Sequence, residues 1–445
     1  MSHEIANKIK LVEIEANIMA SPLEDYILEN DFRILKSIGC GSFGEVRLAC
    51  HLPTHTQVAV KLIAKKQNGL AHNVPEVEIL QSLEHRNIVR FFHSIDTLQM
   101  TYVVMEYVEG QDLEMFIRDI DYLQEEEARP IFQQVVTAVH FLHERLIAHR
   151  DIKLENILID GAGNIKLCDF GMATRLTEGE MLTKVCGTLL YMAPEMLAGE
   201  PYDGLAVDMW SLGVVLYVLV TGKFPYEETT CPALSRLITT TNYPTPYHLS
   251  QPCLITIAQL LTVPSQHRVT ICQLLERRWL GHIEEHGEPA SKEIHLRVVE
   301  NMCTIGYSCE EIVSSLRHRQ PNNKVRATYN ILKHKLTCKD SHHQNEKPWL
   351  ISSPVRVLLP LKRRASEPAF SNFRDAGNSD FQEVDMEGRR KKPKLYHDEQ
   401  ICLHGTDIQI RNTHQVSEHG LLLRAIIQGA NMPNDHYRFG PTTSG

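Results

Sequence analysis

The sequence lacks the cysteine pattern of a disulfide-stapled or zinc-bound protein. Its eleven cysteines are odd in number and scattered, and no two of them stand in C-x-x-C spacing. Disulfide frameworks are typical of small secreted domains, and structural zinc sites are typical of paired, closely spaced cysteines. We therefore expect reduced thiols, no metal cage and an intracellular protein.

Long apolar runs and an excess of basic charge are absent as well. The longest strongly apolar stretch, residues 212–220, has nine residues, whereas a membrane-spanning helix needs ~20. Residues 1–30 contain no continuous apolar segment of the kind that signal peptides carry. The formal net charge of −9 argues against nucleic acid as the main partner. These features predict a soluble, cytoplasmic protein without membrane or nucleic-acid partners, with 212–220 in a buried core helix.

The chain divides into segments with different secondary-structure patterns. With 445 residues it is about three times the ~150 that one domain typically uses. Residues 31–108 alternate like strands, apart from a helical pattern at 74–85, and residues 112–280 have mainly helical periodicity. A β-rich lobe followed by an α-rich lobe leaves a cleft between them, where ligands tend to bind. We predict an N-terminal extension at 1–30, a two-lobed domain at 31–282, a three-helix unit at 293–336 and a largely disordered, polar tail at 340–445.

A glycine-rich segment in the first lobe fits a phosphate-binding turn. Gly39, Gly41, Gly44 and Val46 match G-x-G-x-x-G-x-V, and glycines let a backbone approach phosphates closely. Such a match in isolation is more often an ordinary β-turn. Fifteen residues after Val46, however, the predicted strand VAVK ends in Lys61, whose ammonium would point into the same cleft.

Most lysines are exposed on the surface. If Lys61 instead points into the cleft, it needs an anionic partner. The helix that follows offers Glu76, and Glu78 is the alternative on a different helical face. The position of the two glutamates relative to the apolar residues of the helix favours Glu76.

Oxygen ligands with the spacing of a divalent-cation site follow in the second lobe. Asp151 and Asn156 lie five residues apart in HRDIKLEN, and Asp169 opens DFG eighteen residues after Asp151. Carboxylate and amide oxygens suit a hard cation. An isolated DFG is usually only a turn. Both motifs follow the glycine loop and the lysine in this order, which makes coincidence negligible.

Together these residues resemble the signature of the eukaryotic protein kinase family. The resemblance covers about 31–282 and continues through the APE motif ending in Glu195, through Asp208 and to Arg268. It implies a bilobal α+β fold with a β-rich N-lobe and an α-rich C-lobe. In that family, Glu195 pairs with the arginine and Asp208 anchors the catalytic loop.

The resemblance further implies that the cofactors are ATP and Mg²⁺. Lys61, held by Glu76, would grip the ATP phosphates, Asn156 and Asp169 would hold the metal, and Met105 stands at the gatekeeper position. The residues expected to contact the nucleotide are Ile38, Gly39, Gly41, Gly44, Val46, Ala59, Lys61, Glu106 and Val108.

The remaining roles concern the acceptor substrate. Asp151 would orient the attacking hydroxyl, and Lys153 would steady the γ-phosphate. Lys153 and Thr188 are typical of serine/threonine kinases, so the resemblance implies protein substrates with Ser/Thr acceptors. Asp112, near the mouth of the cleft, either favours a basic residue upstream of the target or is a solvated surface carboxylate.

The segment 293–336 resembles a ubiquitin-associated (UBA) three-helix domain, because of the turn at Gly306-Tyr307 and of ATYNIL at 327–332. A kinase followed by such a domain is similar to the AMP-activated-kinase-related group, particularly the microtubule-affinity-regulating kinases. The short tail is more similar to the sperm motility kinases of that group. In this group the domain packs on the kinase, which implies an intramolecular role, and ubiquitin binding does not follow. The plain alternative is an unrelated small helical bundle.

The activation segment, 169–195, departs from the family pattern. Related kinases carry a phosphorylatable Thr two residues before the Cys of CGT, where this chain has Lys184. A phosphate there would pair with Arg150 and order the loop, which a lysine cannot do. Either Thr183 substitutes after modification by an upstream kinase, or other contacts order the loop, or activity is low.

Two other readings stay open. A pseudokinase scaffold is the alternative function, although such proteins usually lose residues equivalent to Lys61, Asp151 or Asp169, which this chain retains. In the tail, Ser366 fits a target of a basophilic kinase, and the basic run at 389–394 is either a nuclear localisation signal or a solvated charge run.

Overall fold

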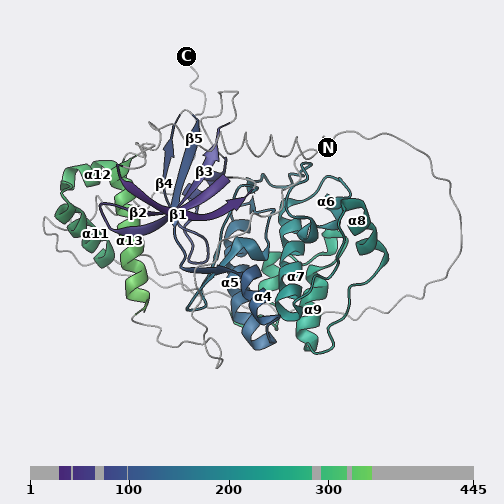
Figure 1. The fold of residues 1–445 in the computed structure, drawn as a ribbon. Helices are drawn as coiled ribbons and strands as arrows, with labels where there is room; N and C mark the ends of the chain where they lie inside the picture. Colours follow the sequence, from purple (N-terminus) through teal and green to yellow (C-terminus); the bar gives the residue numbers. More distant parts are fainter. Residues whose placement is uncertain are drawn as a thin grey trace, which may run out of the picture.

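The computed structural model describes residues 30–41, 44–65, 75–97, 99–282, 292–317 and 323–342. Nearly all of the predicted N-terminal extension and of the tail therefore lies outside the described residues, together with Ser366 and the basic run. The described residues form a sheet-rich lobe, a helical lobe and a three-helix unit (Figure 1).

The first lobe is a five-stranded antiparallel sheet in the order β1-β2-β3-β5-β4. The strands are β1 (Phe32–Gly41), β2 (Gly44–His51), β3 (Thr56–Ala64), β4 (Phe91–Asp96) and β5 (Met100–Glu106). Side chains along a strand point alternately to opposite faces of the sheet. On one face the apolar and β-branched residues Val58, Val60 and Leu62 are buried against Phe92 and Tyr102.

One helix, α3 (Pro75–Ser82), lies in this lobe and buries Val77, Ile79 and Leu80. It is shorter than the predicted 74–85. Pro75 suits the first helical position because its missing N–H would have no helical partner there.

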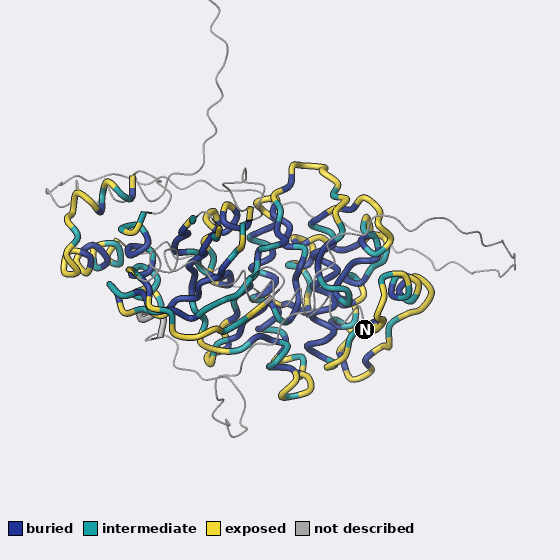
Figure 2. The backbone as a smooth tube through the Cα atoms, turned by 45° about the horizontal axis from the view of Figure 1, so that its top comes forward, coloured by how far each residue is buried: buried dark blue, intermediate teal, exposed yellow. Residues whose placement is uncertain are grey.

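The second lobe is built around long buried helices. Its helices are α4 (Leu113–Ile120), α5 (Glu125–His143), α6 (Pro194–Leu197), α7 (Gly204–Thr221), α8 (Cys231–Thr240), α9 (Gln251–Leu260) and α10 (Ile271–Leu275). Of the described residues, only α7 is long and apolar enough to cross a membrane, and 83% of it is buried inside the protein. The predicted core helix over 212–220 is therefore confirmed. Figure 2 shows the buried backbone concentrated inside the lobe.

Short elements between the lobes carry the loops of the cleft. They are β6 (Gly110–Asp112), β8 (Ile157–Asp160) and β9 (Ile165–Leu167) in one small sheet, β7 (Ile147–Ala148) and β10 (Thr174–Arg175) in another, and the 3₁₀ turns at Leu154–Asn156 and Leu189–Tyr191. A third 3₁₀ turn, Ser265–His267, connects α9 and α10 within the helical lobe. One continuous apolar cluster reaches from Ala59 and Met105 of the sheet into the helical lobe. The two lobes therefore share a core.

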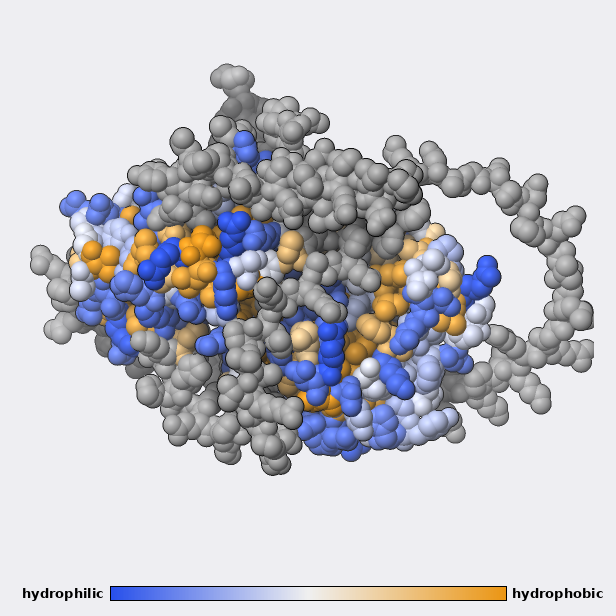
Figure 3. Space-filling view, in the orientation of Figure 1, coloured by the Kyte–Doolittle hydropathy of each residue, from blue (hydrophilic) through white to orange (hydrophobic). Residues whose placement is uncertain are grey.

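Three helices, α11 (Lys292–Ile305), α12 (Cys309–Arg317) and α13 (Lys324–His342), pack around their own apolar cluster. The third helix runs six residues beyond the predicted end at 336, because no glycine or proline interrupts 337–342. Figure 1 shows α13 beside the sheet of the first lobe, and Ile331 of α13 is fully buried in the apolar cluster of that sheet. Hydrophilic residues cover most of the visible outer surface of the unit (Figure 3).

Candidate active site

Lys61 joins the two lobes through carboxylates on either side. It lies in the middle of β3, and its Nζ is 2.6 Å from Oε1 of Glu76 on α3 and 2.8 Å from Oδ1 of Asp169 in the second lobe. Burial alone would lower the pKa of Lys61, but Asp169 and Glu76 together raise it above its usual value. The ammonium is therefore a fixed positive charge at the cleft. Glu78, the alternative partner, is exposed.

Asp169 is held in its ionised form by this contact. Burial would raise the pKa of its carboxyl, but attraction and a hydrogen bond from Lys61 outweigh burial and lower that pKa. Its backbone has a φ of +62°, and its Oδ1 also accepts from the Gly171 N–H at 3.4 Å. Strained backbone of this kind tends to cluster at functional sites.

The glycine segment forms the hairpin between β1 and β2. Gly39 lies opposite Val46, and Gly41 lies opposite Gly44, while Ser42 and Phe43 at the tip are outside the described residues. Gly44 has a φ of +134°, and a Cβ there would come within 1.9 Å of the Leu62 carbonyl oxygen. No other residue type fits that position without moving β3.

The remaining residues expected to contact the nucleotide lie near this hairpin or at the connection between the lobes. Ile38 lies on β1, and Ala59 on β3 lies opposite Met105 on β5. Val108 follows β5 and packs against the shared core, as do Ile38 and Val46. The sheet thus brings the expected nucleotide residues to one region.

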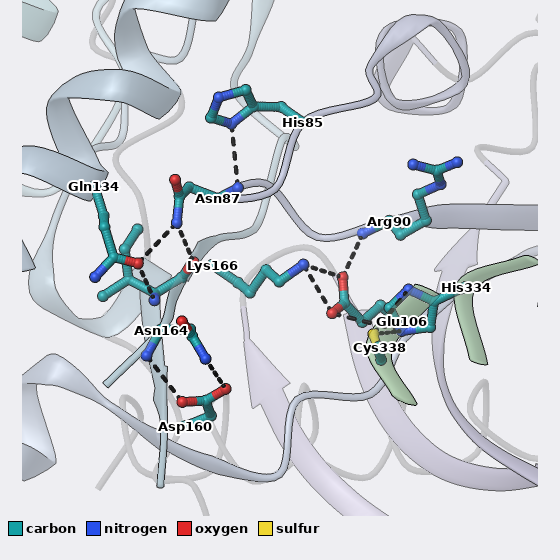
Figure 4. Close-up of polar contacts among 11 residues, drawn as sticks. His85, Asn87, Arg90, Glu106, Gln134, Asp160, Asn164, Lys166, His334 and Cys338 are labelled. Atoms are coloured by element: carbon teal, nitrogen blue, oxygen red, sulfur yellow. Dashed lines mark hydrogen bonds and ion pairs between the residues drawn. The ribbon is translucent and has the colours of Figure 1, made fainter. Parts of the chain in front are cut away.

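Glu106 differs from the other residues expected to contact the nucleotide. Its side chain is bound to other protein groups behind the cleft. Figure 4 shows its carboxylate meeting Lys166 at 2.9 Å and the backbone N–H of Arg90 at 3.0 Å. His334 of α13 approaches the same carboxylate, with its Nε2 3.7 Å away. Only the backbone of Glu106 remains for a nucleotide. No local pattern in the sequence marks Lys166 or His334, because they lie 60 and more than 200 residues from Glu106.

The segment His149-Arg150-Asp151 is held from beneath by one buried carboxylate. Asp208 on α7 is fully buried, and it accepts hydrogen bonds from the backbone N–H groups of His149 and Arg150, both at 2.8 Å. Its Oδ2 also contacts Nε2 of His143 at 3.0 Å. These bonds stabilise Arg150 in a backbone conformation with a φ of +61°.

Asp151 is the centre of a small polar group. Thr188 Oγ1 donates to its Oδ1 at 2.9 Å, and Lys153 Nζ lies 3.3 Å from its Oδ2. Lys153 also donates to Thr188 Oγ1 at 2.8 Å, and Asn156 Nδ2 donates to the Asp151 carbonyl at 2.8 Å. The carboxylate of Asp151, the ammonium of Lys153 and the side-chain amide of Asn156 therefore lie together.

The pair Asn156 and Asp169 fits a divalent cation by its chemistry. The amide nitrogen of Asn156 is used on Asp151, which leaves its oxygen as a ligand. Among the described residues, Lys61 and Gly171 donate to Oδ1 of Asp169, and Oδ2 receives no donor. Hard cations such as Mg²⁺ prefer these oxygen ligands.

The structure agrees with the expectation for Glu195 and differs from one interpretation of Asp112. Glu195 pairs with Arg268 through both of its oxygens, at 2.7 and 3.0 Å, beneath the site. Asp112 is buried, so the interpretation as a solvated surface carboxylate was wrong. Its Oδ1 accepts the Met115 N–H at 2.8 Å and so caps the N-terminus of α4.

The comparisons with known proteins agree with this geometry. Residues 32–280 match the protein kinase domain family. Mouse sperm motility kinase Z is 34% identical over 368 residues, which cover 80% of this chain and 74% of the relative. Mouse sperm motility kinase 3A is 35% identical over 364 residues, which cover 78% of this chain and 72% of the relative. The chain belongs to the protein kinase family, and sperm motility kinases are among its homologues.

Proposed function

We propose that the chain is an active ATP- and Mg²⁺-dependent kinase that transfers the γ-phosphate to serine and threonine hydroxyls of protein substrates. The observation that carries the proposal is Lys61, which contacts both Glu76 and Asp169 and so brings the two lobes into one charged site. A scaffold that only binds partners has no need of this buried arrangement, whose desolvation is costly unless every charge is paired.

Each residue then has a defined task. Lys61 binds the α- and β-phosphates, and Asp151 accepts the hydrogen bond of the attacking hydroxyl and holds it in line. Lys153 stays near the γ-phosphate. Magnesium, when bound by Asn156 and Asp169, supplies neutralisation of the charge on the transferred phosphoryl group. The protein contributes positioning and electrostatics, with no covalent step of its own.

Serine/threonine preference rests on the contact between Asp151, Lys153 and Thr188. Thr188 holds the activation segment against both residues at 2.8–2.9 Å, beside the place where an acceptor hydroxyl would enter. Lys153 and Thr188 are the residue types typical of serine/threonine kinases at these positions, and their contacts with Asp151 support this preference.

The test is transfer of radiolabelled γ-phosphate from Mg·ATP to three versions of one basic peptide, with Ser, Thr or Tyr as acceptor. We expect labelling of the Ser and Thr peptides by the full chain and none by Asp151→Asn. Asp160→Asn is the matched control, because Asp160 caps a turn outside the cleft through N–H groups that an amide oxygen can still accept. Transfer to the Tyr peptide alone, or equal labelling by wild type and Asp151→Asn, would contradict the proposal.

The pseudokinase alternative gives a different result in the same experiment. A scaffold would label none of the peptides, while still binding a nucleotide or a partner protein. A thermal shift with ATP that occurs without magnesium and without transfer would favour the scaffold.

We further propose that α11–α13 form a UBA-like domain of an AMP-activated-kinase-related enzyme, and that this domain acts within the chain. The contacts of α13 with the first lobe support this. Asn330 donates to the Phe92 carbonyl at 3.1 Å, and Lys335 donates to the Thr54 carbonyl at 2.8 Å. Tyr307, in the turn of the domain, lines a narrow crevice together with Phe32, the first residue of β1, and Asp31 just before it. We expect no capture of the full chain on immobilised ubiquitin, and strong capture would contradict an intramolecular role.

The names of the relatives suggest where the enzyme works. We propose a cytoplasmic role in signalling that controls sperm motility, with protein substrates and an upstream activating kinase as partners. Immunofluorescence of sperm with an antibody against this chain tests the location. Signal confined to nuclei would favour a nuclear role for residues 389–394 instead.

A further inference from the structure

The structure describes the whole activation segment, 169–195. In it, Lys184 stands where related kinases have a threonine that can be phosphorylated. Thr183 and Lys184 are both exposed, while Cys186 and Gly187, just after them, are buried. Lys184 itself cannot be phosphorylated, so other contacts are needed to hold this stretch of the chain beside the site. The question is which group contacts Arg150 in place of a phosphate.

Arg150 is already engaged by uncharged acceptors. Its Nε donates to the Met172 carbonyl at 2.9 Å, and its Nη1 donates to the hydroxyl of Tyr202 at 3.4 Å. Hydrogen bonds from a guanidinium are charge-assisted even when the acceptor is neutral. The arginine thus contacts the start of the activation segment and Tyr202 at once.

Tyr202 contacts the other side of the segment with both its side chain and its backbone. Its side chain is almost fully buried, and its hydroxyl donates to the Lys184 carbonyl at 2.6 Å. Its backbone exchanges two hydrogen bonds with Leu182, both at 2.8 Å. Burial raises the pKa of Tyr202 to about 12, so the hydroxyl keeps its proton and can donate to Lys184 while accepting from Arg150.

A short, tightly packed path leads from Lys184 to Asp151. Gly187 has a φ of +104°, and a Cβ there would lie 2.7 Å from the Arg150 carbonyl oxygen, so the two backbones touch. The next residue, Thr188, donates to Asp151 at 2.9 Å. The close backbone contact at Gly187 thus lies between Lys184 and the hydroxyl that contacts Asp151.

We propose that Tyr202 is a positioning residue that takes over the task of the missing phosphate, by joining Arg150 to the backbone of Lys184 and so holding Thr188 at Asp151. This inference rests on the proposed kinase activity and deepens it, since it makes the enzyme active without phosphorylation of its activation segment. The link is made by a neutral hydroxyl, which contributes less than a charged phosphate but is always present.

The first test compares full-length wild type, Tyr202→Phe and Tyr217→Phe, each treated with phosphatase and checked by mass spectrometry. Tyr217 is the matched control, because it is a buried tyrosine whose hydroxyl donates to the Pro244 carbonyl, away from the activation segment. We expect kcat/KM of Tyr202→Phe to fall roughly 5- to 100-fold, mostly through kcat, because the hydrogen bonds of the hydroxyl with Arg150 and with Lys184 are both lost. We expect Tyr217→Phe to retain the wild-type value. Equal kcat/KM for all three proteins would overturn the proposal.

The second test separates positioning from a general loss of structure. Lys184→Glu added to Tyr202→Phe supplies a carboxylate that can pair with Arg150, as a phosphate would. We expect the double variant to recover at least half of the lost kcat/KM. Failure to recover any activity would show that a negative charge opposite Arg150 cannot replace the Tyr202 hydroxyl, and the proposal would be wrong.

Hydrogen exchange tests the inference independently of catalysis. In Tyr202→Phe, amides of residues 182–188 should exchange several-fold faster than in wild type or Tyr217→Phe, because both ends of the segment lose a partner. If wild type transfers no phosphate, the kinase proposal fails, but faster exchange in this variant alone would still establish the link. Unchanged exchange would refute the link whether or not the enzyme is active.

Discussion

At the scale of single residues, Lys61 links the proposed activity to the stability of the fold. The ammonium separates two carboxylates that would otherwise face each other inside the protein, since the side chains of Lys61 and Glu76 are only 6% and 5% exposed. Removal of one member of a buried ion pair leaves the other charge without compensation.

We therefore predict that Lys61→Met abolishes phosphate transfer and also lowers the free energy of unfolding, by about 3 kcal/mol. The cost lies at the low end of the range for buried pairs because the Asp169 side chain is 30% exposed. Urea unfolding and the transfer assay measure the two effects. Lys65→Met is the control: Lys65 directly follows β3 and pairs with Asp96 at 3.0 Å, but at a partly exposed site. If Lys61→Met keeps full activity, the assignment of this lysine is wrong.

At the scale of secondary-structure elements, α13 completes the core of the sheet. Ile331 is fully buried among residues of β3, β4 and β5, and it is the one residue of the three-helix unit in that described cluster. Loss of its side chain would leave a cavity that neither the sheet nor the helix can close.

We predict that Ile331→Ala lowers the free energy of unfolding by about 2–4 kcal/mol, with the first lobe affected most. Ile305→Ala is the matched control, because Ile305 on α11 is 39% exposed and should cost far less. Urea unfolding of the full chain gives the stability, and hydrogen exchange in β4 and β5 locates the effect. Equal losses in the two variants would mean that α13 does not stabilise the sheet.

The elements also show where sequence reasoning was sufficient and where it was not. The pair of Lys61 with Glu76, the buried helix α7 and the three helices after 292 follow from spacing and periodicity, which are local signals. The contact of Ile331 with the sheet could not be predicted, because a residue on an amphipathic helix fits the core of its own domain equally well. The proposed role of Tyr202 depends on long-range packing, which no motif encodes. The Asp112 cap, by contrast, is a local contact that a helix N-terminus signal could have predicted.

At the scale of the whole molecule, three buried or half-buried histidines make stability depend on pH. The pKa values of His51, His85 and His93 are lowered to about 4, chiefly by burial, from the usual 6.5. Asp31 partly opposes this for His51 and His93, and Lys324 of α13 reinforces it for His93. Between pH 6.5 and 4 the unfolded chain binds protons that the folded chain does not, so protons favour unfolding in that window.

We predict that the free energy of unfolding falls from pH 7 to pH 5 by roughly 2 kcal/mol for each of these histidines. Urea unfolding at the two pH values measures the change. His93→Gln should flatten the dependence, because glutamine takes no proton, whereas replacement of the exposed His267 by glutamine should leave it as in wild type. Stability that is the same at pH 5 and pH 7 would contradict this prediction.

The docking of α13 also determines how the protein must be made. The Phe92 carbonyl accepts a hydrogen bond from Asn330, which the ribosome adds 238 residues later. At about 5–20 residues per second this delay is on the order of 10–50 s. During that time the first lobe has been synthesised, but Phe92 and its apolar neighbours have no helix to cover them. A nascent chain that stalls before α13 emerges would therefore depend on chaperones to stay out of aggregates, and the last described helix sets the moment when the first-made lobe becomes complete.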